Sequence, residues 1–201
     1  MDSPAAPLYP IGPLIMEAGG NVMKLLGFLA CGMAVCALSV AHAQAPPAGV
    51  KDQQALLKSK DAKLAANKQL VYDMYRAIVQ GGHYEMAEKY FTPEYIQHNP
   101  NVASGRDALV TFIKQSRPQR PIPPTMTFPL ISLIAEGDMV MVATVTWEDD
   151  PEKAGEKYAT THFDLYRIEN GLIAEHWDHV PKSKGAKTFD PNTIVEKQKA
   201  Q

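Results

Sequence analysis

Apolar positions divide the chain into a helical first part and a strand-rich second part. From about residue 52 to residue 80, large apolar side chains recur mostly at steps of three and four, and the pattern stops at Gly81 and Gly82. This spacing is typical of a helix that buries one face. It predicts one long helix, with a break near Ser59 as the alternative.

Two shorter helices and an extended segment are expected next. The first helix covers YEMAEKYF and ends at Thr92-Pro93, because proline disfavours a helical residue before it. EYIQHNP then reads as a short strand or an extended segment that ends at Asn99-Pro100. The helix after it, GRDALVTFIKQS, places its apolar side chains on one face and has Ser104 as its expected cap.

The second part alternates in the manner of strands. Four segments rich in β-branched and aromatic residues are separated by short polar turns, which favour antiparallel neighbours; they span 125–136, 138–149, 156–169 and 172–180. Helices followed by a meander predict an α+β fold, in which about three N-terminal helices cover one face of a curved antiparallel sheet. The covered face can enclose a pocket.

The N-terminal region has the pattern of an export signal. Lys24 follows Met23, an apolar run fills 25–40, and Ala41-His42-Ala43 is a small-x-small cleavage site. The run is shorter than the roughly 20 residues of a membrane span, so cleavage near Ala43 and no stable membrane anchor are expected. A retained anchor is the alternative. The predicted divisions are an upstream extension at 1–22, a signal peptide at 23–43, a linker and helix lead-in at 44–60, a domain at 61–181 and a loosely ordered tail at 182–201.

Composition excludes some partners and chemistries. The 201 residues include 20 basic and 22 acidic side chains, for a formal charge of -2, without a sustained basic stripe. Nucleic acid is therefore not an expected partner, because binding to its phosphates requires such a stripe. Both cysteines, Cys31 and Cys36, lie in the predicted signal, so the mature protein would have no disulfide and no thiolate nucleophile.

Ionisable side chains gather on the last two predicted strands, in HFDLYRIENGLIAEHWDHV. Alternation puts His162, Asp164 and Tyr166 on one face of their strand, and His176 and Asp178 on one face of the next. A three-residue turn with a glycine bulge would place Asp178 opposite His162 and His176 opposite Asp164. We favour this register. A two-residue Asn170-Gly171 turn would instead place Asp178 beside Phe163.

Three interpretations of this cluster remain open from the residues. Carboxylates beside imidazoles in a partly dry pocket can accept and return a proton near neutral pH, as enolisation or aldol chemistry requires. His98 would supply a further donor to a developing oxyanion. The alternative interpretations are a solvated outer face of the sheet, or a zinc or iron site, although no strong ligand motif such as HExxH is present.

The chain resembles the SnoaL-like polyketide cyclase family, within the nuclear transport factor 2-like superfamily. The resemblance rests on YIQHNP, the GRDAL helix start and the FDLYRIENG…EHWD ending, and it extends over about 66–181. It implies a cystatin-like cone of curved sheet and helices, often dimerised through the sheet. It also implies acid/base catalysis without metal or organic cofactor, by Asp178 with His162 and with His98 lining the pocket. The further residues expected around this pocket are Asp164, His176, Tyr95, Tyr166 and Trp147.

The sequence therefore predicts an exported, periplasmic or secreted protein that needs no cofactor. The expected activity is that of an aldol cyclase, isomerase or lyase on a small carbonyl compound. The alternative is a binding or accessory domain that holds a small hydrophobic molecule without chemistry. A homodimer is the expected assembly.

Overall fold

The computed structural model describes residues 45–182. The predicted upstream extension and signal peptide, and all but the first residue of the predicted tail, lie outside the described residues. Within residues 45–182, no helix is long and apolar enough to cross a membrane.

Five helical segments precede or interrupt the sheet: α1 (Gln53–Leu57), α2 (Ala62–Met74), the π-helix η1 (Tyr75–Gln80), the 3-10 helix η2 (Tyr84–Lys89) and α3 (Arg106–Ser116). The long helix expected from the apolar spacing is broken between α1 and α2, near Ser59. Asp61 begins α2 by accepting hydrogen bonds from the amides of Lys63 and Leu64, which satisfies two of the first free N–H groups of the helix.

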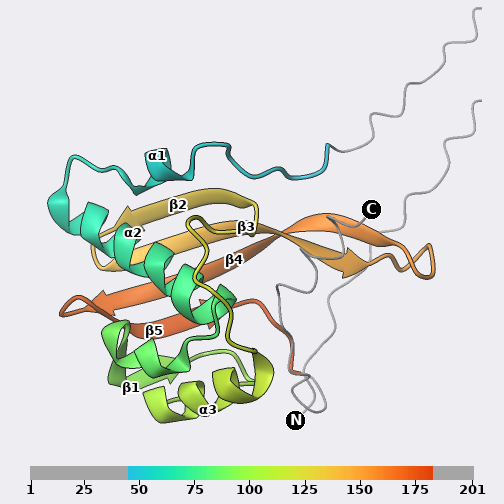
Figure 1. Cartoon of the computed structure of the whole chain (residues 1–201). Coiled ribbons are helices and arrows are strands. Elements are labelled where there is room, and N and C mark those ends of the chain that lie inside the picture. Colours follow the sequence, from blue (N-terminus) through green and yellow to red (C-terminus); the bar gives the residue numbers. More distant parts are fainter. Residues whose placement is uncertain (1–44, 183–201) are drawn as a thin grey trace, which may run out of the picture. The chain divides into compact units, whose positions relative to one another are not determined.

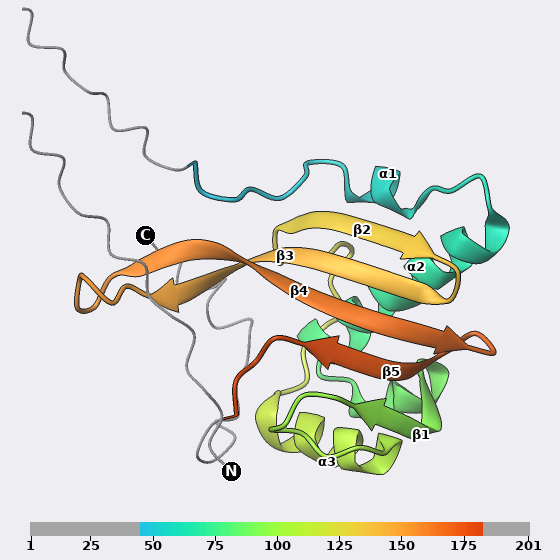
Figure 2. The same cartoon turned by 180° about the vertical axis from the view of Figure 1, so that it is seen from behind.

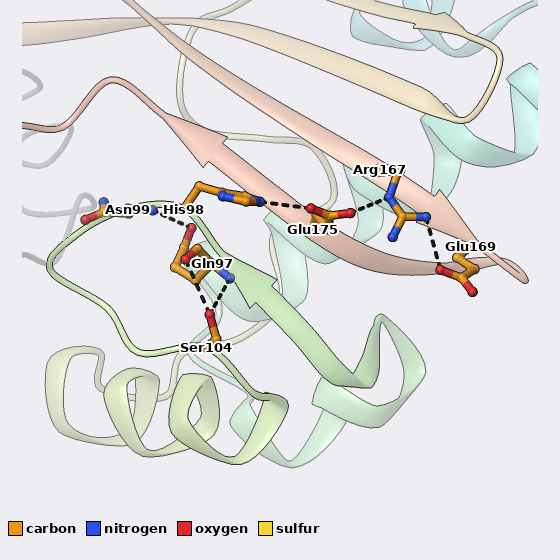
Figure 3. Close-up of polar contacts among 7 residues, drawn as sticks. All are labelled: Gln97, His98, Asn99, Ser104, Arg167, Glu169 and Glu175. Atoms are coloured by element: carbon orange, nitrogen blue, oxygen red, sulfur yellow. Dashed lines mark hydrogen bonds and ion pairs between the residues drawn. The ribbon is translucent and has the colours of Figure 1, made fainter.

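The start of α3 differs from the prediction. Its N-cap is Gly105, which makes no side-chain cap hydrogen bond and has a φ of 97°. Ser104 instead uses its hydroxyl on β1, where Oγ accepts from the amide of Gln97 and donates to the Gln97 carbonyl (Figure 3). Ser104 thus ties the loop to the strand rather than capping the helix.

Within residues 45–182, the sheet contains the four predicted strands of the meander and a fifth strand that includes the first part of the extended segment EYIQHNP. In the order β1-β5-β4-β3-β2, its strands are β1 (Phe91–Gln97), β5 (Leu172–Asp178), β4 (Lys157–Glu169), β3 (Met139–Asp149) and β2 (Leu130–Glu136). β2 to β5 form the expected antiparallel meander, whereas β1 is parallel to β5. Thr92-Pro93 lies within β1 and does not end a helix. Because β1 is an edge strand, the missing proline N–H is tolerated there.

The helices lie on one face of the sheet, with α2 across β2 and β3 and α3 beside β1 (Figures 1 and 2). The core between them buries aromatic and aliphatic side chains almost completely, among them Tyr72, Ile78, Ile113, Leu133, Val142 and Ile173. The fold is α+β as predicted, with one sheet face covered by helices.

The β4–β5 hairpin combines features of both predicted registers. The turn has two residues, Asn170 and Gly171, with φ of 51° and 77°, and it pairs Glu169 with Leu172. A bulge then shifts the pairing, so that Asp178 lies opposite Asp164 and not opposite His162. The favoured pairing is wrong. Because the bulge adds one residue, His176 and Asp178 still return to the face of Asp164.

Candidate functional site

A buried carboxylate lies at the centre of the polar cluster. The Asp164 side chain is 10% exposed. Its Oδ1 lies 3.2 Å from Nε2 of His162 and 2.9 Å from Nε2 of His176. Its Oδ2 accepts a hydrogen bond from the hydroxyl of Tyr75. Three donors from three elements therefore meet at one aspartate, which is the arrangement that a buried charge needs.

Local structure explains how these groups meet. Alternation along β4 directs His162, Asp164 and Tyr166 to the helix-covered face, and the bulge in β5 directs His176 there. Tyr75 begins η1, the π-helical continuation of α2, and is buried against β4. Single π-helical turns are rare and occur often at functional sites.

The charges of the cluster stabilise each other. Burial raises the pKa of Asp164, but the hydrogen bonds and charges of His162 and His176 outweigh it and hold this pKa well below its usual range. For His162, burial lowers the pKa, whereas the hydrogen bond and charge of Asp164 and the charge of Asp178 raise it above its ordinary value. The pair thus favours the aspartate anion, and it makes the protonated form of His162 more stable than that of a free imidazole.

Asp178 is the second carboxylate of the cluster. Its Oδ2 accepts a hydrogen bond from Nδ2 of Asn99 at 2.8 Å, and its Oδ1 accepts from the amide of Val180 at 3.1 Å. It lies directly opposite Asp164 across the β4–β5 pair, where like charges repel. A proton on His162 reduces this repulsion, and the charge of Asp178 is one of the causes that raise the pKa of His162.

Among residues 45–182, Asp164, His176 and Asp178 form a group that could hold a metal ion. One ligand atom from each lies within 4.8 Å of the others. Two carboxylates and an imidazole suit zinc or non-haem iron. In the structure, hydrogen bonds to His162, His176, Tyr75 and Asn99 already occupy the carboxylate oxygens of Asp164 and Asp178.

Three tyrosines enclose the cluster on its helix side. The ring of Tyr166 stacks on His176 at 4.5 Å and meets Tyr75 edge-on. Tyr95, on β1, is 1% exposed. Burial and the negative charges of Asp164 and Asp178 raise the pKa of Tyr95, so its hydroxyl stays protonated and can only donate or accept a hydrogen bond as a neutral group.

His98 does not join the cluster. It follows β1 on the other face of the sheet, where its Nε2 lies 2.9 Å from Oε2 of Glu175 and its ring stacks on Trp177 at 4.4 Å (Figure 3). Glu175 in turn pairs with Arg167. His98 was expected to line the pocket, but its amide continues the parallel pairing of β1 with β5 by donating to the His176 carbonyl. Alternation from the buried Tyr95 therefore places His98 on the opposite face of the sheet.

Trp147 is also separated from the cluster. It lies opposite Ala159, three register positions along from the Thr144–His162 pair, and alternation assigns it to the opposite face from His162. An open pocket with a volume of ≈ 490 Å³ lies mainly on that face, where Met141, Thr161, Phe163, Leu165, Trp177 and His179 line it, and Asp164 and Asp178 complete its lining.

The comparison with known sequences establishes the family. The SnoaL-like domain profile matches residues 71–176, which is more than half of the chain. The chain belongs to the SnoaL-like family. No curated protein gives a significant match.

Solved structures similar to this SnoaL-like protein have low sequence identity to it. TsrD from Streptomyces laurentii is 22% identical, covers 60% of this chain and 90% of its own, and has a TM-score of 0.40. A protein assigned as a polyketide cyclase from Acidithiobacillus ferrooxidans is 20% identical over 60% and 89%, with a TM-score of 0.42. A protein of cystatin-like fold from Xanthomonas campestris is 17% identical over 62% and 97%, with a TM-score of 0.43.

Two residues of this SnoaL-like site carry contacts that the sequence did not reveal. Tyr75 lies on the apolar face of the expected long helix, and that place gave no sign that its hydroxyl would meet Asp164. Asn99, which orients Asp178, had no distinguishing pattern beyond its place before Pro100. Asp164, expected as a lining residue, is the centre of the cluster.

Proposed function

We propose that this SnoaL-like protein is an acid/base enzyme that acts without a cofactor on a small carbonyl compound, as an aldol cyclase, isomerase or lyase. The observation that carries the proposal is the paired arrangement of His162 and Asp164 beside a second carboxylate, Asp178. Such an arrangement holds an acid and a base within one partly dry site. The side chain of His162 remains 26% exposed, so protons can exchange with solvent.

The two catalytic groups have complementary roles in the proposed reaction. The carboxylate of Asp178 takes the proton from the carbon next to the substrate carbonyl, and the electron pair of that C–H bond moves to the carbonyl oxygen. His162 donates a hydrogen bond to the oxygen as it becomes negative. The enolate then attacks a second carbonyl or is reprotonated at another carbon by Asp178, which returns the proton.

Substitution of Asp178 tests this function. In Asp178→Asn the base is lost while the side chain keeps its size, so turnover of activated ketones and aryl esters should fall by roughly 10²–10⁴-fold. His162→Gln should show a loss of similar order. Rates would be measured with purified protein, after circular dichroism has confirmed that each variant folds.

Glu175→Gln is the matched control for these variants. It removes a carboxylate that pairs with histidine and arginine on the opposite sheet face, so its turnover should equal that of the wild type. Wild-type turnover in Asp178→Asn would contradict the assignment.

The proposal includes export to the periplasm or cell exterior. It rests on the apolar run at 25–40 and the Ala41-His42-Ala43 cleavage pattern. Cell fractionation with N-terminal sequencing of the mature protein should find a chain that begins near residue 44. A full-length chain in the cytoplasm would contradict export.

A non-catalytic binding domain is the second candidate. It is favoured by the hydrogen bonding of Asp164, whose two oxygens already accept three bonds, as a purely structural carboxylate would. A binding domain would retain a small apolar molecule in native mass spectrometry and leave it unchanged over a long incubation.

A further inference from the structure

The shared use of one oxygen by two histidines has a chemical consequence. Oδ1 of Asp164 lies within hydrogen-bond distance of Nε2 of both His162 and His176, and Oδ2 is taken by the Tyr75 hydroxyl. An ionised carboxylate can only accept hydrogen bonds. Both imidazoles must therefore carry a proton on Nε2, and Nδ1 is the only ring nitrogen of each that can gain or lose one.

We propose that Asp164 is a positioning residue that holds His162 in the Nε2–H tautomer and thereby presents its Nδ1 to the substrate. The proposal rests on the proposed function for its catalytic consequence, but the tautomer itself is independent of any reaction. Asp164 does not exchange the proton, because its oxygens are occupied by three donors.

The surroundings of the two histidines assign them different roles. His176 is 12% exposed and stacks on Tyr166, so it is fixed within the core. His162 is more exposed, its ring lies 4.7 Å from that of His179, and within residues 45–182 its Nδ1 has no hydrogen bond. His162 is therefore the histidine that can reach a substrate.

Charges on several elements favour the protonated form of His162. These charges are Asp164 on β4, the strand of His162 itself, Asp178 on β5 and Glu148 on β3. Two other imidazoles lie near His162: that of His176, on the same carboxylate, and that of His179, whose ring lies 4.7 Å away. Tyr75 is a neutral donor to Asp164. In the protonated form Nδ1–H donates to a substrate oxygen, and in the neutral form Nδ1 accepts a proton. Either form keeps Nε2–H on Asp164.

Nitrogen-15 NMR of the wild-type protein, labelled at histidine, tests the tautomer without any substrate. Two-bond proton–nitrogen correlations distinguish Nε2–H from Nδ1–H imidazole. At a pH above the pKa of His162, the signals of His162 and His176 should both be those of Nε2–H. An Nδ1–H form at His162 would overturn the proposal, whatever the enzyme activity.

The variant Asp164→Asn tests whether the carboxylate of Asp164 fixes the tautomer of His162. Its amide is isosteric but uncharged, so the pKa of His162 should fall and its tautomers should become mixed. If the protein catalyses the proposed reaction, kcat should fall roughly 10²–10⁴-fold, KM should change little, and the alkaline limb of the pH–rate profile, where His162 loses the proton that it donates, should move to lower pH. An unchanged His162 tautomer and pKa in a folded Asp164→Asn protein would refute the role of Asp164.

Glu175→Gln again supplies the control, because it removes the carboxylate partner of His98 on the other face. Only the signals of His98 should move in this variant. If Asp164→Asn does not fold, the wild-type tautomer measurement still decides the proposal. A correct tautomer without turnover would refute the proposed function alone.

Discussion

At the residue scale, Asp164 is the side chain on which the site depends. Its carboxylate is buried among donors from β4, β5 and η1. The free-energy cost of removing this charge from water is therefore compensated only while all three hydrogen bonds are present. Removing such a carboxylate leaves imidazole and hydroxyl donors without a partner in the core, which is costly. The same geometry that orients the histidines therefore contributes to stability.

Stability should depend on pH through this pair. The pKa of Asp164 is lowered, so its contribution is full above the ordinary Asp pKa of about 3.9 and is lost as the pH falls through the lowered value. The pKa of His162 is raised, so its contribution is full below about 6.5 and is lost as the pH rises through the raised value. The pair should contribute most between about pH 4 and pH 6.5.

Urea unfolding at a series of pH values would measure this effect. Asp164→Ala should lower the free energy of unfolding by about 3–5 kcal/mol in that window and flatten the acidic limb. A loss below about 0.5 kcal/mol, which is typical of surface substitutions, would show that the pair is energetically unimportant.

At the scale of elements, the β4–β5 hairpin decides which side chains meet. With its two-residue turn and no bulge, the hairpin would place the side chains of His176 and Asp178 on the outer face. The bulge leaves Ala174 without a cross-strand partner between the Ile168–Ile173 and Arg167–Glu175 pairs, and so returns both side chains to the helix-covered face. The site therefore depends on the turn and bulge acting together.

Gly171 is the residue of this turn most sensitive to substitution. Its φ of 77° is unfavourable for side chains with a Cβ, although a Cβ would meet nothing within 4 Å. Gly171→Ala should therefore cost about 1–2 kcal/mol from backbone strain alone. Gly171→Asn, which tolerates this conformation better, should cost less. Equal stability of all three proteins in urea unfolding would contradict the role of the turn.

At the scale of the whole molecule, we propose that the outer sheet face forms the interface of a homodimer. It exposes apolar side chains around the open pocket, and 49% of Phe163 is accessible. Exposed apolar surface of this kind favours association. The homodimer expected from the family resemblance would cover it.

Phe163→Asp should convert this dimer to a monomer, because it would place two charges in an apolar interface. Light scattering after size-exclusion chromatography would measure the mass. Val50→Asp, at another exposed apolar side chain, is the control and should remain dimeric. A monomeric wild type would remove the basis for an interface on this face.

The sequence by itself determined the elements, the fold class and the family. Apolar spacing located the helices and the four strands of the meander, because helix and strand periods differ. The motifs around 95–100 and 163–178 indicated the SnoaL-like family. Alternation within each strand also placed His162 with Asp164, and His176 with Asp178, since side-chain direction along a strand is a local property.

Only the tertiary structure decided how these pairs meet. The bulge at Ala174 sets Asp178 opposite Asp164, η1 brings Tyr75 to the same carboxylate, and the parallel pairing of β1 with β5 sets His98 beside Trp177 on the far face. Each depends on contacts between residues distant in sequence, about which no local period carries information. Asp164 became the central group for the same reason: a carboxylate is stable in a core only where distant segments supply its donors.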